Sequence, residues 1–403
     1  MNAPWLAIVG IGEDGPDGLS VAARALVQGA VLVVGGRRHL ALAQGLFRGE
    51  TMAWPSPIED AFPALLARRG RPVTVLASGD PYHFGVGSVL SRLVDPGEIV
   101  CHPAPSAYAL ACARLGWAMQ DVATISFCGR PIAAVAPLLQ PGARVLALSA
   151  DGDTPRLVAN FLDERGFGAT RIHVMEALGG AHEAIHVRRA DAFETASANR
   201  LNLLALEVAC DGSASVIPLV AGRPDALYEH DGQLTRREVR AVTLSSLAPR
   251  QGERLWDVGG GAGSVGIEWM LSHPANTAIT IEPNAARVAS IRRNAGRLGV
   301  PGLAVVHGAA PDALAGLAPP DAIFIGGGGG QPGVIDAAWN ALRPGGRIVA
   351  NAVTIETEAV LLAARARLGG TLLRLSFERL DAVGTMHAYR PAMTVTQWSA
   401  TRP

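Results

Sequence analysis

Short runs of valine, isoleucine and leucine recur along the first half of the chain and alternate with longer segments rich in alanine, leucine and arginine. The runs have the length of strands, and their continuous apolar character is typical of strands buried on both faces. The intervening segments are long enough for helices. This rhythm predicts an α/β fold with a largely parallel sheet. The predicted strands lie within residues 5–12, 30–36, 72–80, 98–106, 143–150, 170–178 and 201–209.

The texture changes in the middle of the chain, where glycine, proline, aspartate and serine recur from Asp211 to Leu234. Such a composition is typical of a connection between domains. The αβ alternation then restarts, so we expect two α/β domains, over residues 1–210 and 230–403, joined by a linker over residues 211–229. The second domain is predicted to contain helices over 235–247, 264–272 and 285–299 and strands within 253–259, 278–283, 303–308, 321–327, 346–353, 371–380 and 392–399.

The composition narrows the class of protein. The 403 residues are 49% hydrophobic and 17% charged, which suits two packed domains and argues against a disordered chain. Every apolar run is interrupted well short of the thickness of a bilayer. The formal net charge is zero, and the four cysteines show no CxxC spacing. We therefore expect a cytoplasmic enzyme with reduced thiols, without a membrane, nucleic-acid or metal partner. We also expect a homo-oligomer, although the sequence does not fix the oligomeric state.

The chain contains no lysine, so all 35 of its Lys and Arg residues are arginines. A phosphate-binding lysine, a Schiff-base lysine and a pyridoxal anchor are therefore all excluded. Any anionic substrate must be held by arginine side chains, backbone amides or helix N-termini. Arg236, Arg237 and Arg347 are candidates for that role, although each could equally be a solvated surface residue.

The stretch LWDVGGGAGSVGIEW, from Leu255 to Trp269, has the layout of a nucleotide-binding strand, turn and helix. It also contains a GxGxxG pattern that is used by dinucleotide sites. Two carboxylates bear on the choice of cofactor. Asp257 stands where a dinucleotide fold normally has an apolar residue, and we expect it near a cationic group of the ligand. Glu282 ends the next predicted strand, where a carboxylate can accept ribose hydroxyls in either kind of site.

The segments that follow the glycine loop settle the choice. Three segments occur in a fixed order after the loop: HGAAPDAL, DAIFIGGGGG and LRPGGRIVANAV. This series resembles the class I S-adenosylmethionine-dependent methyltransferases. Among these enzymes, it most resembles the precorrin methyltransferases of cobalamin biosynthesis. The resemblance implies that a glycine-rich floor over residues 326–330 faces the substrate, with Gly327, Gly328, Gly329 and Thr354 nearest to it. The residues that it implies in contact with the methyl donor are Thr235, Gly259, Gly260, Gly261, Ala262, Gly263, Glu282 and Ala310.

The first half lacks such a loop and carries three other motifs. VGIGEDGPDGLS, SGDPYHFGVG and PAPSAYALACARLGW occur in the order of the three motifs of tetrapyrrole methylases, which they resemble. The resemblance implies a second S-adenosylmethionine site between two αβ subdomains, with Gly79, Asp80, Pro81 and Ser106 as donor contacts. Two positions depart from the family pattern: PAPSA stands where PGxSS is usual, and Cys128 stands where relatives often have histidine.

One further motif points elsewhere. His182-Glu183-Ala184-Ile185-His186 spells HExxH, which binds zinc when both histidines lie on one face of a helix. Here the preceding Gly179-Gly180 disfavours a helix, and AIHVRR alternates as a strand does. On a strand the two histidines would lie about 13 Å apart, which is too far for one ion. We therefore expect no zinc site.

The two resemblances together imply a fusion of a tetrapyrrole methylase with a class I Rossmann-like methyltransferase, and a cobalamin-pathway activity. The implied reaction is methylation of precorrin-6B at carbons 5 and 15, with loss of carbon dioxide from the ring C acetate, to give precorrin-8. Carbon 5 would be methylated by the first domain, and carbon 15 methylation with decarboxylation would belong to the second. The remaining alternatives are a cobalt-containing substrate, a nucleic-acid methyltransferase, an NAD dehydrogenase and a non-catalytic sensor of the donor.

Overall fold

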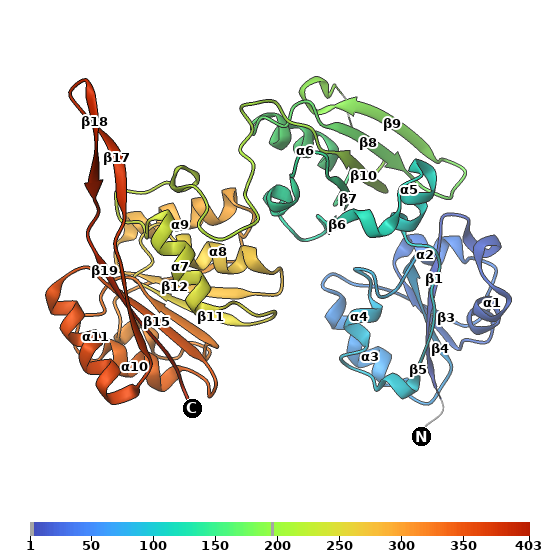
Figure 1. Ribbon diagram of the computed structural model, residues 1–403. Coiled ribbons are helices and arrows are strands. Elements are labelled where there is room, and N and C mark those ends of the chain that lie inside the picture. Colours follow the sequence, from blue (N-terminus) through green and yellow to red (C-terminus); the bar gives the residue numbers. More distant parts are fainter. Residues whose placement is uncertain (1–3, 195–196) are drawn as a thin grey trace. The chain divides into compact units, whose positions relative to one another are not determined.

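The computed structural model describes residues 4–194 and 197–403. The chain divides into two compact units (Figure 1). The first unit is Met1–Ile132 with Gln140–Ala214, and the second is Ala133–Leu139 with Ser215–Pro403. Each unit contains parallel strands with helices packed against them, so the α/β class predicted from the alternating pattern is confirmed. The largely parallel arrangement predicted for the first half holds for its first sheet and not for its second, which is mostly antiparallel.

The first unit opens with a parallel sheet whose strand order is β3-β2-β4-β1-β5. Its strand β1 is buried at every position, as the uninterrupted apolar run predicts. The strands are β1 (Leu6–Ile11), β2 (Leu32–Gly35), β3 (Glu50–Ala53), β4 (Val73–Ser78) and β5 (Ile99–His102). The helices of this part are α1 (Val21–Gln28), α2 (Arg37–Leu42), α3 (Phe62–Leu66) and α4 (Gly87–Leu90).

A second sheet completes the first unit, with the order β6-β7-β10-β8-β9. The pair β6 and β7 is parallel, and the other three pairs are antiparallel. The two sheets match the two αβ subdomains that the resemblance implies. The strands are β6 (Val122–Ser126), β7 (Arg144–Leu148), β8 (Arg171–Glu176), β9 (Ala184–Arg189) and β10 (Asn202–Glu207), and the helices are α5 (Ala107–Leu115) and α6 (Thr154–Asp163).

The second unit contains one large sheet in the order β13-β12-β11-β14-β15-β19-β16. Its first five strands are parallel, and β19 runs antiparallel to both of its neighbours. The strands are β11 (Arg254–Val258), β12 (Thr277–Glu282), β13 (Ala304–His307), β14 (Ala322–Ile325), β15 (Arg347–Ala352), β16 (Thr371–Leu375) and β19 (Val395–Thr401). The helices are α7 (Arg237–Leu247), α8 (Ser264–Ser272), α9 (Ala285–Arg297), α10 (Val334–Ala341) and α11 (Ile355–Leu368).

A hairpin that the hydrophobic pattern missed projects from this sheet (Figure 1). The run over residues 371–380 was predicted as one strand, but the chain leaves the sheet after β16 and forms β17 (Glu378–Val383) and β18 (Met386–Pro391) before it returns as β19. Every residue of the hairpin strands is exposed. The pattern could not locate these strands because neither face is buried.

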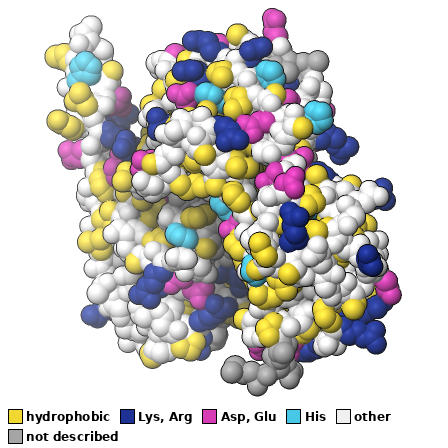
Figure 2. All heavy atoms as spheres, turned by 90° about the vertical axis from the view of Figure 1, so that its right-hand side faces the viewer, with side chains coloured by type: hydrophobic (Ala, Val, Ile, Leu, Met, Phe, Trp, Pro, Cys, Tyr) yellow, Lys and Arg dark blue, Asp and Glu magenta, His cyan; other side chains and the backbone are white. Residues whose placement is uncertain are grey.

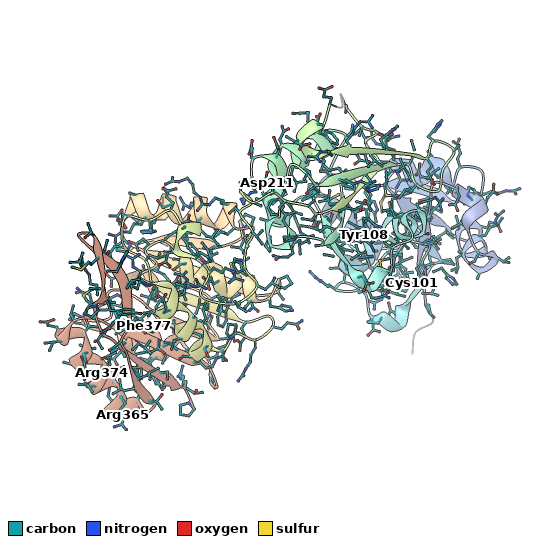
Figure 3. The ribbon with its side chains drawn as sticks, turned by 45° about the horizontal axis from the view of Figure 1, so that its top comes forward. Cys101, Tyr108, Asp211, Arg365, Arg374 and Phe377 are labelled. Carbon is teal, nitrogen blue, oxygen red and sulfur yellow. The ribbon has the colours of Figure 1, made fainter. Side chains whose placement is uncertain are left out.

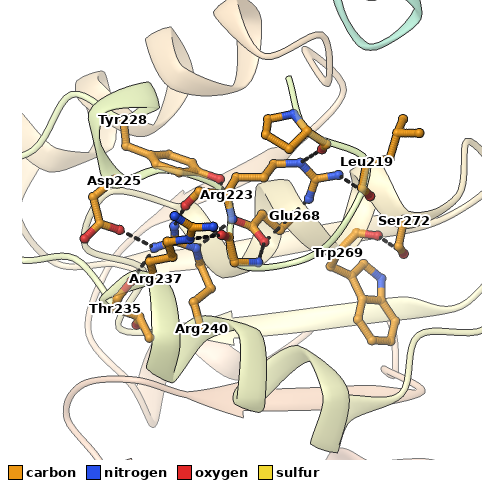
Figure 4. Close-up of polar contacts among 12 residues, drawn as sticks. Leu219, Arg223, Asp225, Tyr228, Thr235, Arg237, Arg240, Glu268, Trp269 and Ser272 are labelled. Atoms are coloured by element: carbon orange, nitrogen blue, oxygen red, sulfur yellow. Dashed lines mark hydrogen bonds and ion pairs between the residues drawn. The ribbon is translucent and has the colours of Figure 1, made fainter. Parts of the chain in front are cut away.

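The segment that leads into the second unit is held by a buried ionic cluster (Figure 4). Glu268, on α8, is inaccessible to solvent and accepts hydrogen bonds from Arg240 Nε at 2.7 Å, Tyr228 Oη at 2.9 Å and the backbone amides of Gly222 and Arg223. The Arg240 side chain is also fully buried, and it donates to the carbonyl oxygens of Arg223 and Thr235. The stretch from Gly222 to Thr235 is therefore packed against α7 and α8.

The surface shows no single concentration of charge on the face drawn in Figure 2, where arginine and acidic side chains are interspersed. Within the described residues, no helix is both long and apolar enough to cross a bilayer.

Candidate active sites

A cavity of about 820 Å³ in the second unit lies across the carboxyl ends of its parallel strands. In the strand order β13-β12-β11-β14-β15 the connections run in opposite directions from β11, and ligands of open α/β sheets bind in the crevice at such a point. Glu282, which ends β12, and Gly259, which follows β11, line one end of the cavity. Asn351 and Val353, at the end of β15, line the other end.

The glycine loop forms the wall of the first end. Gly261 has a φ of +56°, and a Cβ atom at this position would lie 2.7 Å from the carbonyl oxygen of Gln233. An alanine would therefore be strained in its backbone and would collide with the opposite wall. The Gly261 amide donates to Glu282 Oε2 at 2.8 Å, so the loop and the carboxylate are fixed to one another.

Glu282 combines burial with access to the cavity. Only 2% of the residue is exposed, and its Oε1 accepts a second hydrogen bond, from the Asn284 amide at 3.0 Å. Arg287 lies 3.8 Å from the same oxygen. An ionised carboxylate has about four acceptor positions, so Glu282 retains capacity for the hydroxyls of a bound ligand.

Asp257 is placed differently from the interpretation drawn from its sequence position. It is 1% exposed and does not line the cavity; its Oδ2 accepts a hydrogen bond from the Gly266 amide, in the first turn of α8, at 3.0 Å. Burial raises the pKa of the Asp257 carboxyl to about 7, against the hydrogen bonds from Gly266 and Thr280 that lower it. The residue ties β11 to α8 beneath the loop rather than facing a ligand.

The other predicted donor and substrate contacts divide into two groups. Thr235, Gly259, Gly260, Ala310, Gly327 and Gly328 line the cavity. Ala262, Gly263, Gly329 and Thr354 are not among its lining residues. Ala262 is buried and its carbonyl oxygen accepts from Asn294 Nδ2, while the Thr354 hydroxyl accepts from the Thr357 amide at the start of α11.

The far end of the cavity contains residues that the sequence alone did not single out. Phe377, labelled in Figure 3, and Met393 come from the two ends of the hairpin and give this end an apolar wall. Arg379, on β17, forms an ion pair with Glu238, on the first turn of α7, and both line the cavity. Arg236 also lines it. The strands of the hairpin have no buried face, so the sequence contains no hydrophobic pattern that would predict their contact with α7.

Two of the three arginines proposed to hold substrate carboxylates have structural partners instead. Arg347 donates to the Leu247 carbonyl oxygen at 2.6 Å and pairs with Glu253. Arg237 donates to the Gly222 carbonyl oxygen at 2.9 Å, and neither arginine lines the cavity. Of the three, Arg236 alone has a position from which it can reach a ligand there.

In the first unit, the three sequence motifs converge at the carboxyl ends of adjacent strands. The Gly79 amide donates to the Ile11 carbonyl oxygen at 3.3 Å, and the Ala104 amide donates to the Gly79 carbonyl oxygen at 3.1 Å. Gly79 has a φ of +52°, and a Cβ there would lie 2.8 Å from the Pro105 carbonyl oxygen. The loops after β1, β4 and β5 thus pack backbone against backbone, which explains a glycine at the centre.

Two cavities adjoin this junction. Asp80 and Ser106 line one of about 570 Å³, and Gly79 lines a smaller one of about 90 Å³. Ser106 also begins α5, where its hydroxyl accepts from the Ala109 amide at 3.2 Å. Pro81 lines neither cavity, and its carbonyl oxygen accepts from the Gly87 amide at 2.9 Å.

A polar cluster that the sequence motifs did not single out borders the smaller cavity. Glu13, Arg38 and Ser78 line it, and Arg38 pairs with Glu13 and donates to Ser78 Oγ at 2.8 Å. His39 Nε2 lies 2.8 Å from the same hydroxyl. Burial and the adjacent Arg38 lower the pKa of His39 to about 4, so the imidazole is neutral at physiological pH. Glu13 lies inside the first motif and Ser78 inside the second, and these two positions were the signals that could have found the cluster.

The second half of the HExxH stretch has the strand conformation predicted from its alternation, whereas His182 and Glu183 precede the strand. Residues 184–189 form β9, and His186 is on that strand. Glu183 accepts a hydrogen bond from Arg114 Nε at 2.5 Å and from the Gly179 amide at 2.7 Å. Across the part of the chain that the structure describes, no group of three or more His, Cys, Asp or Glu residues is arranged to hold a metal ion.

Each unit matches a known protein family. Residues 6–193 match the tetrapyrrole (corrin/porphyrin) methylases, and residues 226–402 match the precorrin methyltransferase domain. Apart from residues 133–139, which lie in the first match but belong to the second structural unit, each match falls in one unit, and the two together span most of the chain.

Similarity to individual proteins extends over the full length. A precorrin-6Y C(5,15)-methyltransferase [decarboxylating] from Sinorhizobium sp is 56% identical over 400 residues, 99% of this chain and 97% of the relative. The cobalt-precorrin-6B C(15)-methyltransferase (decarboxylating) of Salmonella typhimurium is 35% identical over 162 residues, 39% of this chain and 83% of that protein. The crystallised C-terminal domain of the Rhodobacter capsulatus precorrin-6Y C5,15-methyltransferase is 47% identical and covers 46% of this chain and 100% of its own, with a TM-score of 0.44. The chain belongs to the family of decarboxylating precorrin-6Y C(5,15)-methyltransferases, in which a tetrapyrrole methylase domain precedes a precorrin methyltransferase domain.

Proposed function

We propose that this enzyme methylates precorrin-6B at carbons 5 and 15 and removes carbon dioxide from its ring C acetate, to give precorrin-8. The observation that carries the proposal is the 56% identity over 99% of the chain to a relative whose name specifies both methylations and a decarboxylation. Similarity that covers both domains supports a reaction that uses both.

The proposal includes two S-adenosylmethionine sites, one in each unit. In the second unit, the residues at the Glu282 end of the cavity fit an adenosyl group. Gly261 leaves free the space that a side chain would occupy, and the Glu282 carboxylate can accept hydrogen bonds from the ribose hydroxyls. In the first unit, the loops around Gly79, Asp80 and Ser106 provide backbone amides and carbonyl oxygens beside two cavities. The donor, when bound, supplies an electrophilic methyl group; the chain positions the acceptor carbon and excludes water.

We further propose a division of labour between residues 1–210, which would methylate carbon 5, and residues 230–403, which would methylate carbon 15 and decarboxylate. A separate Salmonella typhimurium protein similar to the second half is named as a C(15)-methyltransferase (decarboxylating), which supports this assignment. Residues 211–229 would join the two. Two residues in the second half of this linker, Arg223 and Tyr228, bind Glu268 and so belong structurally to the second unit.

Mass spectrometry of precorrin-6B after incubation with the full-length protein and the donor tests this function. We expect a product that has gained two methyl groups and lost one carbon dioxide. Parallel incubation with cobalt-loaded precorrin-6B distinguishes the metal-free from the cobalt-containing substrate. Light scattering on the same preparation tests the expected homo-oligomer. If neither of the two tetrapyrroles is methylated, the proposal is refuted.

A further inference from the structure

The cavity of the second unit has a donor end and an acceptor end. Gly259 and Glu282, at the ends of β11 and β12, define the donor end. The other end is bounded by Asn351 and Val353 after β15 and by Phe377 beside the hairpin. A macrocycle that presents a carbon to the donor must occupy this acceptor end, so the groups that surround the leaving carboxylate must come from its walls.

Few of the side chains that line the cavity can supply a proton. Among the described residues that line the cavity, the ionisable side chains are Glu238, Glu282, Arg236, Arg287 and Arg379. An arginine does not release its proton at neutral pH. Glu282 is at the donor end and already accepts hydrogen bonds from two backbone amides. Glu238 is therefore the lining group at the acceptor end that can carry and release a proton.

The partner of Glu238 is itself suited to bind an anion. Arg379 pairs with Glu238 across the cavity wall, and the side chains of Arg379 and Glu238 are 50% and 40% exposed. An ion pair this exposed is weak, and a carboxylate of the substrate can replace Glu238 as the arginine's partner. An arginine fork suits a carboxylate geometrically, and precorrins carry several carboxylates on their periphery.

From this arrangement, and on the basis of the function proposed above, we propose that Glu238 is the proton donor of the decarboxylation and that Arg379 is the substrate-binding residue that releases it. The bond between the acetate methylene and its carboxyl carbon breaks, carbon dioxide leaves, and the electron pair passes into the conjugated macrocycle. The Glu238 carboxyl then gives its proton to the methylene carbon, which becomes a methyl group. The resulting carboxylate recovers a proton from solvent, so that one proton is consumed for each carbon dioxide released.

The surroundings of Glu238 explain how it could alternate between two states. Burial raises its pKa, but its own backbone amide at the start of α7, together with Arg379 and Arg237, lowers the pKa below the ordinary value overall. When Arg379 turns to a substrate carboxylate and the macrocycle covers the site, one lowering influence is removed and the burial increases. The apolar side chains of Phe377, Val353 and Met393 at the same end offer the leaving carboxylate no hydrogen-bond donor, which favours departure of carbon dioxide.

The variant Glu238→Gln in the full-length enzyme tests the proposal, because glutamine keeps the size of the side chain but has no acidic proton. We expect release of carbon dioxide from precorrin-6B to fall by about 100-fold or more, the usual contribution of a general acid. Methylation of carbon 5 and calorimetric affinity for the donor should change by no more than about twofold. Glu238→Asp should restore part of the decarboxylation. The control is Glu358→Gln, which breaks a similar ion pair with Arg374 outside the cavity and should leave all rates unchanged.

Several outcomes would overturn the proposal. One is release of carbon dioxide by Glu238→Gln at the wild-type rate, and another is a parallel loss of donor affinity, which would assign Glu238 to the donor end. If that variant does not fold, Arg379→Gln provides a second test. We expect a KM for precorrin-6B about tenfold higher and a maximal rate within about threefold of the wild type, and an unchanged KM would contradict the proposal. A wild-type enzyme that neither methylates nor decarboxylates would instead refute the function proposed above.

Discussion

The two units build a crevice at the carboxyl ends of parallel strands by different means. In the second unit a carboxylate at the end of a strand, Glu282, is fixed to the glycine loop by the Gly261 amide. In the first unit the junction is made by backbone hydrogen bonds between three loops around Gly79. The carboxylates beside its cavities, Glu13 and Asp80, lie in the loops two residues after β1 and β4 instead of at the last residue of a strand.

A matched pair of glycine substitutions has the largest expected effect on this comparison. Gly79→Ala and Gly261→Ala each place a Cβ within 2.8 Å of an opposing backbone atom, at positive φ. We expect each variant to lose one of two donor sites, so that calorimetry gives a stoichiometry of one instead of two. Gly45→Ala and Gly345→Ala are the controls, because they have positive φ but no atom within 4 Å of the new Cβ. Loss of both sites in either variant would contradict two independent crevices.

The buried cluster of the second unit should show the next largest effect. Glu268→Gln removes the charge that compensates Arg240, and breaking such a buried pair costs about 3–5 kcal/mol. We expect a loss of this size in the free energy of unfolding of the second unit, measured by chemical denaturation. Glu229→Gln, which breaks an exposed pair with Arg293, should cost about 1 kcal/mol or less. Equal losses of unfolding free energy in the two variants would show that burial of the cluster contributes nothing to the stability of the second unit.

Asp257 predicts a pH dependence that belongs to the second unit. Its pKa in the folded protein is about 7, above the ordinary value of 3.8, so between these pH values the folded state keeps a proton that the unfolded state has released. The free energy of unfolding should therefore fall as the pH rises from about 4 to about 7, by a few kcal/mol at most. Asp257→Asn keeps an acceptor for the Gly266 amide and should remove this part of the slope. An unchanged slope in denaturation curves across this range would exclude the residue as its source.

The smallest predicted effect concerns the carboxylate that distinguishes the two crevices. Glu282→Ala should weaken donor binding at one site by about 1.5–3 kcal/mol, the scale of a hydrogen bond to a charged group. Calorimetry should then resolve one unchanged and one weakened site. Two unchanged sites would remove Glu282 from the donor crevice.

The sequence predicted those parts of the fold in which a run of residues is buried. Strands such as β1 and β11 are buried along nearly their whole length, so their runs were recognisable without knowledge of their neighbours. The hairpin of β17 and β18 was missed because the residues of its strands are exposed. Phe377 and Arg379, at its base, line the cavity together with residues that are distant in sequence, and a local pattern does not record such neighbours.

The sites show the same limit. The glycine loops could be found from spacing alone because a short loop is a local feature, and Gly259, Gly260 and Gly261 do line the cavity. The direction in which Asp257 points could not be predicted, because it depends on how α8 packs on β11. The proximity of Glu238 and Arg379 is decided by the path of the hairpin, which local spacing does not record.

The cluster around Glu268 also bears on how two such units came to share one gene. Because Arg223 and Tyr228 complete the shell of a buried carboxylate, a recombination joint downstream of them would have separated the second unit from part of its own interior. Viable joints, natural or engineered, must therefore lie upstream of Gly222. A shortened polypeptide that starts at residue 230 would inherit the defect, whereas one that starts at Ser215 would retain the complete shell.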